Sequence, residues 1–491
     1  MKNGLSQFDF IVTIGVMIKP TPKTEQKGGK IAVRSAAQGD TMKENGGKTT
    51  MDLSSAKIKI NRWLIIMFLG FNFGFSYEPP YIRYTYHEQL TTVCGYTDTQ
   101  LGLMLSAYGT LALLFYVVGG VSADKFSCRK LIVISLTGTA AGCVIMAFYP
   151  PFWVALLVEL LWVVTTIGLL WSPTAKVAGA LGSKEEQGKI FPMLSSFEGV
   201  GALVTTFCCT FIFGMMGAES NHDSFRFVWI GYAVFGIILA IISHLVIPEK
   251  TLEKKELQKQ LERSEKKSEK RAEKKKENRG VLLKVLKNPM TYIAAFIVLG
   301  SYIIYSCLTY TQSYLCDIYG MDMTTASYFS IVRNQMMKII AGPLSIVIMS
   351  IAILKSSPTR LCIATSVLSA IGLAVTLLMP IKPDLLIIVM GLAIILSFIA
   401  LLAKAQNFAC TDETGVDPKI FGTMTGVVSF LGYSSDTWIY TVIGRWQETL
   451  APIDAYNRVW YLALGGCALM FISGIALVMR QKKMQRQQKP V

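Results

Sequence analysis

Twelve apolar runs of the sequence are each long enough to cross a lipid bilayer, which requires about 20 residues of helix. The first six lie near 62–86, 98–122, 130–149, 152–176, 189–216 and 226–248, and the second six near 290–315, 323–351, 359–380, 384–406, 419–444 and 457–479. The chain is 52% hydrophobic and only 16% charged, which excludes an ordinary soluble globule. The sequence therefore predicts an all-α membrane protein with twelve transmembrane helices in two six-helix halves.

Polar segments flank these runs and divide them into two groups. Residues 1–61 are largely rich in Lys, Gly and Thr, which predicts a disordered N-terminal tail. Residues 249–289 alternate in charge without a wide apolar stripe, which predicts a charged, solvated linker helix. The predicted halves are therefore 62–248 and 290–479, and a basic tail follows at 480–491.

The basic residues are distributed unevenly over the loops between the runs. With the N-terminus inside, the inside loops carry most of the Lys and Arg, among them Lys184, Lys355 and Arg360. We therefore expect a multi-pass protein of the cytoplasmic (inner) membrane with both termini in the cytoplasm. Anionic lipid headgroups attract cations in such loops and tails, so the net charge of +16 does not indicate nucleic-acid binding.

The sequence lacks the usual signs of an enzyme or a metalloprotein. Its ten cysteines have no CxxC pair or metal-ligand spacing, and three scattered histidines are too few for a metal site. It has no phosphate-binding loop and no set of nucleophile, base and acid in a suitable context. We expect no cofactor, no metal and no enzymatic activity.

A short repeat relates the two groups of runs. The fifth run of the first group begins with "KIFPML" (189–194), and the fifth run of the second group begins with "KIFGTM" (419–424). Two parallel six-helix repeats with a site between them are typical of secondary transporters.

The polar loop after the second run carries a further motif. Its residues Gly120, Asp124, Lys125, Arg129 and Lys130 match the pattern Gly-x-x-x-Asp-(Arg/Lys) followed by basic residues. In this the chain resembles the major facilitator superfamily, and the resemblance extends over the whole membrane part. It implies the twelve-helix fold of that family and transport by alternating access. We expect a monomer.

Longer stretches, such as "YIRYTYHEQL" after the first run, resemble a bacterial branch known as sugar-phosphate or nitrate/nitrite permeases. Two departures from the family pattern stand out. The equivalent loop of the second half, 355–361, has no aspartate, and Glu198-Gly199 is not followed by the expected arginine.

Charged residues inside apolar runs are costly unless they face a partner or a wet cavity, so each is a functional candidate. We predict that Arg83, Arg333 and Lys338 bind substrate, because a guanidinium fork suits phosphate or carboxylate oxygens. The superfamily's organic phosphate exchangers also resemble this chain in placing an arginine on helix 1. The alternatives for Arg83 are extension to the surface or pairing with Glu78.

Carboxylates in the runs are candidates for ion coupling. Glu78, Glu198 and Asp436 are each predicted to carry a coupling proton or to form an ion pair between the halves. Glu159 and Lys404 are assigned to the membrane interfaces. Four cations therefore balance four acids, so an anionic substrate is favoured by the depth of Arg333 and by the resemblance.

Aromatic side chains offer apolar faces and polar edges for a sugar-sized ligand. We select Tyr77, Tyr81, Tyr305 and Tyr433 as substrate-binding candidates, because helices 1, 7 and 11 line the cavity in the superfamily.

The polar loop of 119–130 predicts a cytoplasmic gate. Asp124 is expected near the N-terminal end of helix 11, at 417–419, and Lys125, Arg129 and Lys130 on the inner face. Gly120 allows helix 2 to approach a neighbour. This latch would break when the protein opens inward.

We therefore predict a secondary active transporter for a small polar, anionic metabolite such as an organic phosphate or carboxylate, acting as an ion symporter or exchanger. The expected partners are the substrate, a coupling proton or sodium ion, and the lipid bilayer. One alternative is proton-driven efflux of drugs or other hydrophobic compounds. A second is a non-transporting sensor on a transporter fold.

Overall fold

The computed structural model describes residues 50–51, 60–181, 187–217, 222–247, 283–351, 354, 357–416 and 418–487. Its helices overlap all twelve predicted spans. Within the described residues, nine helical segments are long and apolar enough to cross a membrane. The other predicted spans, near 62–86, 98–122 and 419–444, are also helical. An all-helical membrane fold is confirmed.

The first half begins with a two-residue antiparallel pair, β1 (Thr50–Met51) with β2 (Ile60–Asn61). Its helices are α2 (Arg62–Tyr77), α3 (Arg83–Thr92), α4 (Asp98–Lys125), α5 (Cys128–Met146), α6 (Phe152–Val163), the π-helix η1 (Val164–Trp171), α7 (Ser172–Ala180), α8 (Gln187–Met215), η2 (His222–Phe225) and α9 (Arg226–Val246).

The second half is built in the same way. Its helices are α12 (Pro289–Leu308), α13 (Thr311–Tyr319), α14 (Met323–Ile331), the π-helix η3 (Val332–Met336), α15 (Met337–Met349), α16 (Pro358–Leu378), η4 (Pro383–Leu385), α17 (Leu386–Gln406), η5 (Phe408–Thr414), α18 (Pro418–Gly432), η6 (Ser434–Thr437), α19 (Ile439–Thr449) and α20 (Pro452–Gln487).

Polar caps fix where several of these helices begin. Thr97 and Gln100 form a capping box at α4, and the Ser127 side chain accepts from the Lys130 backbone N–H at α5. Asn288 before Pro289 starts α12 in the same way. The connections therefore stay short, and consecutive helices run back and forth.

Two helices extend beyond the spans predicted from hydropathy. The first span is interrupted after Tyr77 and resumes as α3 to Thr92, so it does not end near residue 86. The last span was expected at 457–479, but α20 runs from Pro452 to Gln487. Its polar end includes part of the segment that was predicted as a tail.

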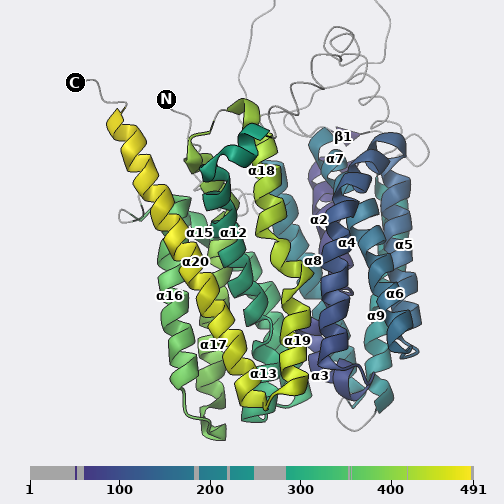
Figure 1. Cartoon of the computed structure of the whole chain (residues 1–491). Coiled ribbons are helices and arrows are strands. Elements are labelled where there is room, and N and C mark those ends of the chain that lie inside the picture. The colour runs from purple at the N-terminus through teal and green to yellow at the C-terminus, as the bar shows by residue number, and fades with distance from the viewer. Residues whose placement is uncertain are drawn as a thin grey trace, which may run out of the picture. The chain divides into compact units, whose positions relative to one another are not determined.

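Each half has its own hydrophobic core, and Figure 1 shows the purple-to-teal half beside the green-to-yellow half. In the first core the rings of Trp162 and Trp229 stack with centroids 6.0 Å apart. In the second, Tyr314 packs edge-on against Trp460 at 5.4 Å. Tyr84 and Leu105 of the first half join this second core, so the halves also pack on each other.

Glycines allow the closest approaches between helices. A Cβ at Gly74 of α2 would lie 2.0 Å from the Glu198 carbonyl oxygen of α8. A Cβ at Gly102 of α4 would lie 2.2 Å from the Tyr440 carbonyl oxygen of α19, in the other half. Both are far below any normal contact, so the backbones pack directly against each other.

The two ends of the bundle differ in how the halves meet. We call the end where α2 begins and α20 finishes the terminal end, and the other the opposite end (Figure 1). Among the described residues, hydrogen bonds between the halves run from mid-span to the opposite end, as in Arg83–Gln447, Gln312–Thr85 and Thr99–Glu448. The described part of the molecule is therefore held closed at its opposite end.

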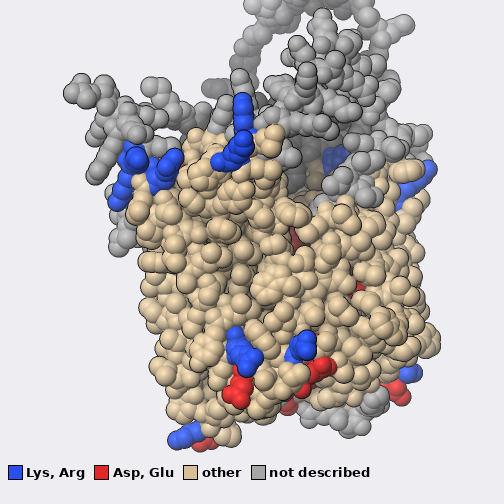
Figure 2. All heavy atoms as spheres, in the orientation of Figure 1, with Lys and Arg blue, Asp and Glu red and all other residues tan. Residues whose placement is uncertain are grey.

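Charged side chains are sparse over the middle of the bundle. On the face drawn in Figure 2, basic residues gather at the terminal end, and the acidic residues on the surface lie near the opposite end. The belt between them is almost free of charge, as expected for a surface in hydrocarbon.

Candidate functional site

The sequence Tyr77-Glu78-Pro79-Pro80-Tyr81 breaks the first helix near mid-span. Two consecutive prolines remove backbone donors and clash with the preceding turn. The backbone instead makes short turns, with Glu78 N–H donating to Phe75 O at 3.1 Å. Irregular backbone at membrane depth is tolerated where it is buried in protein or lines a wet cavity. The break therefore places Glu78 inside the protein.

Glu78 is bound by both halves. The Thr206 hydroxyl of α8 donates to its carboxylate at 2.7 Å, and the Gln335 side-chain amide of η3 donates to both oxygens at 2.9 Å. Gln335 is only 6% exposed. The structure thus ties Glu78 to neutral donors across the interface.

Arg83 does not take either of its expected alternative roles. It is 6% exposed, so it does not extend to the surface. Its Nη2 donates to Gln447 Oε1 at 3.2 Å, and its guanidinium lies 4.1 Å from the Tyr310 ring centroid. Both partners belong to the second half, so Arg83 joins the halves instead of pairing with Glu78.

Lys338 and Glu198 form an ion pair between the halves. Lys338 Nζ of α15 lies 2.6 Å from Glu198 Oε1 of α8. The Lys338 side chain is 49% exposed, yet it also interacts electrostatically with Glu78 and Tyr305. Because these neighbours face the interface, Lys338 lies in a solvent-accessible space between the halves.

Arg333 is the most deeply buried cation of the group. It lies in the π-helix η3, is 2% exposed, and donates from Nη1 to the Leu308 carbonyl at 2.8 Å. Leu308 ends α12, where the seventh span is interrupted, so its carbonyl has no helical partner. Arg333 Nε and Nη2 have no hydrogen-bond partner among the described residues.

Asp436 lies where the eleventh span is broken. The 3-10 turn η6 separates α18 from α19, and Asp436 Oδ2 accepts from the Tyr302 hydroxyl at 3.0 Å. The other oxygen, Oδ1, is buried and has no partner among the described residues. Gly109 of α4 packs directly on Asp436, with a Cβ position 2.7 Å from the Asp436 Cβ.

Tyrosines from both halves surround these charges. The Tyr81 ring contacts Tyr77, Tyr84 and Tyr108, with centroids 6.4, 5.4 and 5.3 Å away. In the second half, Tyr302 contacts Tyr305 at 5.8 Å and Tyr433 at 4.7 Å. The four tyrosines chosen from the sequence therefore fall into these two clusters.

Lys404 is a residue whose position was wrongly predicted. It was assigned to a membrane interface, but its Nζ lies 3.4 Å from the Tyr305 ring centroid and 5.1 Å from that of Tyr302. Glu159, assigned likewise, is 2% exposed within the first half. An isolated charge inside the run "SFIALLAKAQNF" was the signal that Lys404 faces the interior.

The predicted gate is only partly described. Gly120, Asp124 and Lys125 lie in α4, but their side chains fall outside the described residues, as does the residue at 417. Arg129 Nη1 donates to the His244 carbonyl at 3.4 Å, and Lys130 is exposed. The latch therefore stays a prediction.

A family comparison fits this arrangement of two halves around an interior polar site. The sequence model of the Major Facilitator Superfamily matches residues 63–435. The chain belongs to the Major Facilitator Superfamily.

Relatives of this superfamily member bear different names. It is 31% identical over 415 residues to the inner membrane protein YqcE of Escherichia coli K12, covering 84% of this chain and 93% of YqcE. It is 24% identical over 144 residues to the class H tetracycline resistance protein of Pasteurella multocida, covering 29% and 34% of the two chains.

Solved structures of superfamily transporters share its fold. The nucleoside transporter NupG superimposes with a TM-score of 0.60 at 14% identity, covering 85% of this chain and 98% of NupG. None of these three proteins is named for sugar phosphate or nitrate, so that branch of the superfamily stays a prediction. The chain is a multi-pass membrane protein of a transporter family.

Proposed function

We propose that the protein is a secondary active transporter that moves a small anionic metabolite, such as an organic phosphate or carboxylate, across the inner membrane by alternating access. The observation that carries this proposal is the bare edge of Arg333. The Nε and Nη2 groups on one side of a guanidinium form the parallel fork that binds carboxylate or phosphate with two hydrogen bonds.

The energetics of Arg333 support a ligand at this edge. A buried charge is costly unless it is paired and fully hydrogen-bonded. The carbonyl of Leu308 and the partial negative charge at the end of α12 offset only part of that cost. An anion that reaches the free edge would supply the missing partner.

The surroundings of Arg333 suit a polar substrate body. Tyr84 of α3 and Tyr305 of α12 both interact with Arg333, so rings from both halves border it. Lys338 and Lys404 add two cations nearby, although Glu198 pairs with the first. A phosphate or carboxylate on a hydroxylated carbon skeleton fits this mixture of cations and phenols.

Ion coupling is the second part of the proposal. Glu78 accepts hydrogen bonds from Thr206 of the first half and Gln335 of the second. Protonation of this carboxylate would weaken its hold on both donors and so loosen the interface. We therefore assign Glu78 as the coupling residue, with Asp436 and Glu198 as further candidates.

The orientation follows from the charge pattern and the closed end. With the terminal end in the cytoplasm, the hydrogen bonds between Arg83, Thr85 and Thr99 and the second half close the extracellular side. Substrate would then enter or leave at the cytoplasmic side in this conformation. Opening toward the outside requires these bonds to break.

Purified protein tests the substrate class. Thermal unfolding midpoints are measured across a panel of phosphates, carboxylates, sugars and inorganic anions, because a ligand of the folded state raises the midpoint. The anion that stabilises the protein is then used for uptake into proteoliposomes. Arg333→Gln should abolish both effects, whereas Arg458→Gln, at an exposed position, should retain them. Undiminished uptake by Arg333→Gln removes Arg333 from the site.

Efflux of a hydrophobic compound is the second candidate function. The observation in its favour is the partial similarity to a tetracycline resistance protein. Stabilisation by lipophilic cations or tetracyclines in the same panel, without stabilisation by any anion, would select this alternative.

A further inference from the structure

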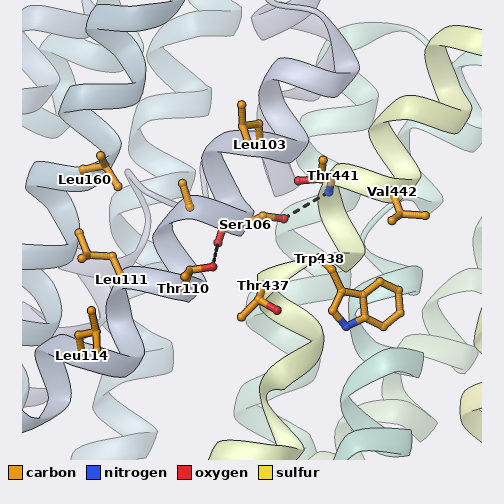
Figure 3. Close-up of a pocket in the computed structure, with 11 residues that line it drawn as sticks. Leu103, Ser106, Thr110, Leu111, Leu114, Leu160, Thr437, Trp438, Thr441 and Val442 are labelled. Carbon is orange, nitrogen blue, oxygen red and sulfur yellow. Dashed lines mark hydrogen bonds between the residues drawn. The ribbon is translucent and has the colours of Figure 1, made fainter.

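A groove runs along the surface where the two halves meet. It lies between α4, α6 and the η6–α19 segment, has a volume of about 580 Å³, and is lined by Leu103, Ala107, Leu114, Leu160, Trp438 and Val442 together with four hydroxyl residues. Figure 3 shows α4 on one side of this seam groove and Trp438 and Val442 on the other. Ligand sites commonly measure about 300–1,000 Å³.

The seam groove lies at the depth of the hydrocarbon. Its α4 residues fall inside the second predicted span, Leu160 inside the fourth, and its α19 residues inside the eleventh. Leu114 is 64% exposed, and Leu157 on the adjoining α6 surface is 66% exposed. The groove is therefore continuous with the apolar surface that the bilayer covers.

The hydroxyl groups of the groove are already used within the protein. Thr110 donates to the Ser106 carbonyl at 2.8 Å, Thr437 to the Ser434 carbonyl at 2.7 Å, and Thr441 to the Gly102 carbonyl at 3.4 Å. Ser106 Oγ accepts from the Thr441 backbone N–H at 3.3 Å (Figure 3).

These bonds leave methyl groups and aliphatic carbons to face an occupant. None of the eleven described lining residues is charged. An occupant therefore meets an apolar wall with no group to bind a phosphate or a polar headgroup.

We propose that the seam groove binds one acyl chain of a membrane phospholipid, which holds α4 against α19 in the conformation seen here. A chain in the groove contacts Leu103 and Ala107 of one half and Trp438 and Val442 of the other. Behind the groove, Gly102 packs on Tyr440 and Gly109 on Asp436. Separation of α4 from α19 would divide the groove and release the chain.

Fluorescence quenching tests this site without any measurement of transport, so failure here is distinct from failure of the proposed function. Phosphatidylcholine with dibrominated acyl chains is added to the full-length protein in detergent micelles. Bromine quenches indole on contact, and the difference between wild type and Trp438→Phe isolates the signal of Trp438. We expect saturable quenching of Trp438, and native mass spectrometry should retain one phospholipid per protein.

Two variants fill the groove from opposite sides, Ala107→Phe on α4 and Val442→Phe on α19. Each should weaken the saturable quenching at least tenfold, and the pair protects the test against one variant that fails to fold. Ile237→Phe makes a similar change at an exposed position on α9, outside the groove, and should leave the quenching unchanged.

Other outcomes overturn the proposal. Quenching that rises linearly with lipid, equally in all variants, shows only a general lipid surface. Saturable occupancy of the groove by a lipophilic cation in place of phospholipid, or a second copy of the chain retained in native mass spectrometry, assigns the groove to another occupant.

Discussion

Arg83 and Arg333 are both buried arginines near the break points of helices, but their surroundings differ. Arg83 has a side-chain acceptor and an aromatic ring, both from the other half. Arg333 has one backbone carbonyl and a bare Nε–Nη2 edge. The first side chain therefore holds the halves together, and the second is better placed to receive an anion.

His87 lies beyond the apolar part of the first span, beside the α3–α4 connection. Its Nε2 is 2.7 Å from Asp98 Oδ1 and its Nδ1 is 3.1 Å from Glu88 Oε1. Burial by itself lowers the pKa of His87, and the positive charge of Arg83 lowers it further. The hydrogen bonds and charges of the two carboxylates outweigh both and raise the pKa from 6.5 to about 9.

This shift predicts how stability changes with pH. Because the folded state binds the proton more tightly, the stabilisation is complete below pH 6.5 and is lost as pH rises through 9. The loss should be on the order of 3 kcal/mol. Thermal unfolding between pH 6 and 9.5 measures it. His87→Gln should flatten the profile, while His244→Gln, at an exposed position, should not; an unchanged profile in His87→Gln contradicts the assignment.

At the scale of the helix, the contact between α4 and α19 depends on glycine. Gly102→Ala would place a Cβ 2.2 Å from the Tyr440 carbonyl, so the two helices must separate. We expect destabilisation of about 1–3 kcal/mol, typical of overpacking, and a shift toward a conformer open at the opposite end.

Cysteine labelling of Thr99→Cys measures that opening, because Thr99 bonds Glu448 across the seam. Labelling should be faster when Gly102→Ala is also present. Gly465→Ala in α20 is the matched control, since its new Cβ would meet no heavy atom within 4 Å. Equal labelling rates in the two variants would show that Gly102 does not control the seam.

The helices could be predicted from the sequence because a span requires about 20 apolar residues whatever surrounds it. The break after Tyr77 also had a visible cause in Pro79-Pro80. The interruption at Thr309-Tyr310 and the π-helix that carries Arg333 had none, because no proline or glycine marks them. The pairing of Glu78 with Gln335, 257 residues apart, depends on how the halves pack, which helical periodicity does not determine.

At the scale of the whole molecule, the halves meet along two different seams. The seam of α4 and α19 is built from glycines, backbone contacts and the apolar groove. The seam that includes α8 and α15 carries the Lys338–Glu198 ion pair, one turn beyond the interior site. Movement of the halves must therefore change apolar packing on one side and charge pairing on the other.

Reversal of the Lys338–Glu198 pair tests whether it joins the halves. Lys338→Glu and Glu198→Lys each place like charges close together and should lower stability, whereas the double variant restores an opposite pair. Because Lys338 is about half exposed, water screens the interaction, and a coupling of about 1 kcal/mol is expected. Unfolding midpoints of the four proteins give the coupling through a double-mutant cycle. Strict additivity of the two changes would mean that the pair contributes nothing to the joint, and closure in this conformation would then depend on the α4–α19 seam and the neutral bonds of Glu78.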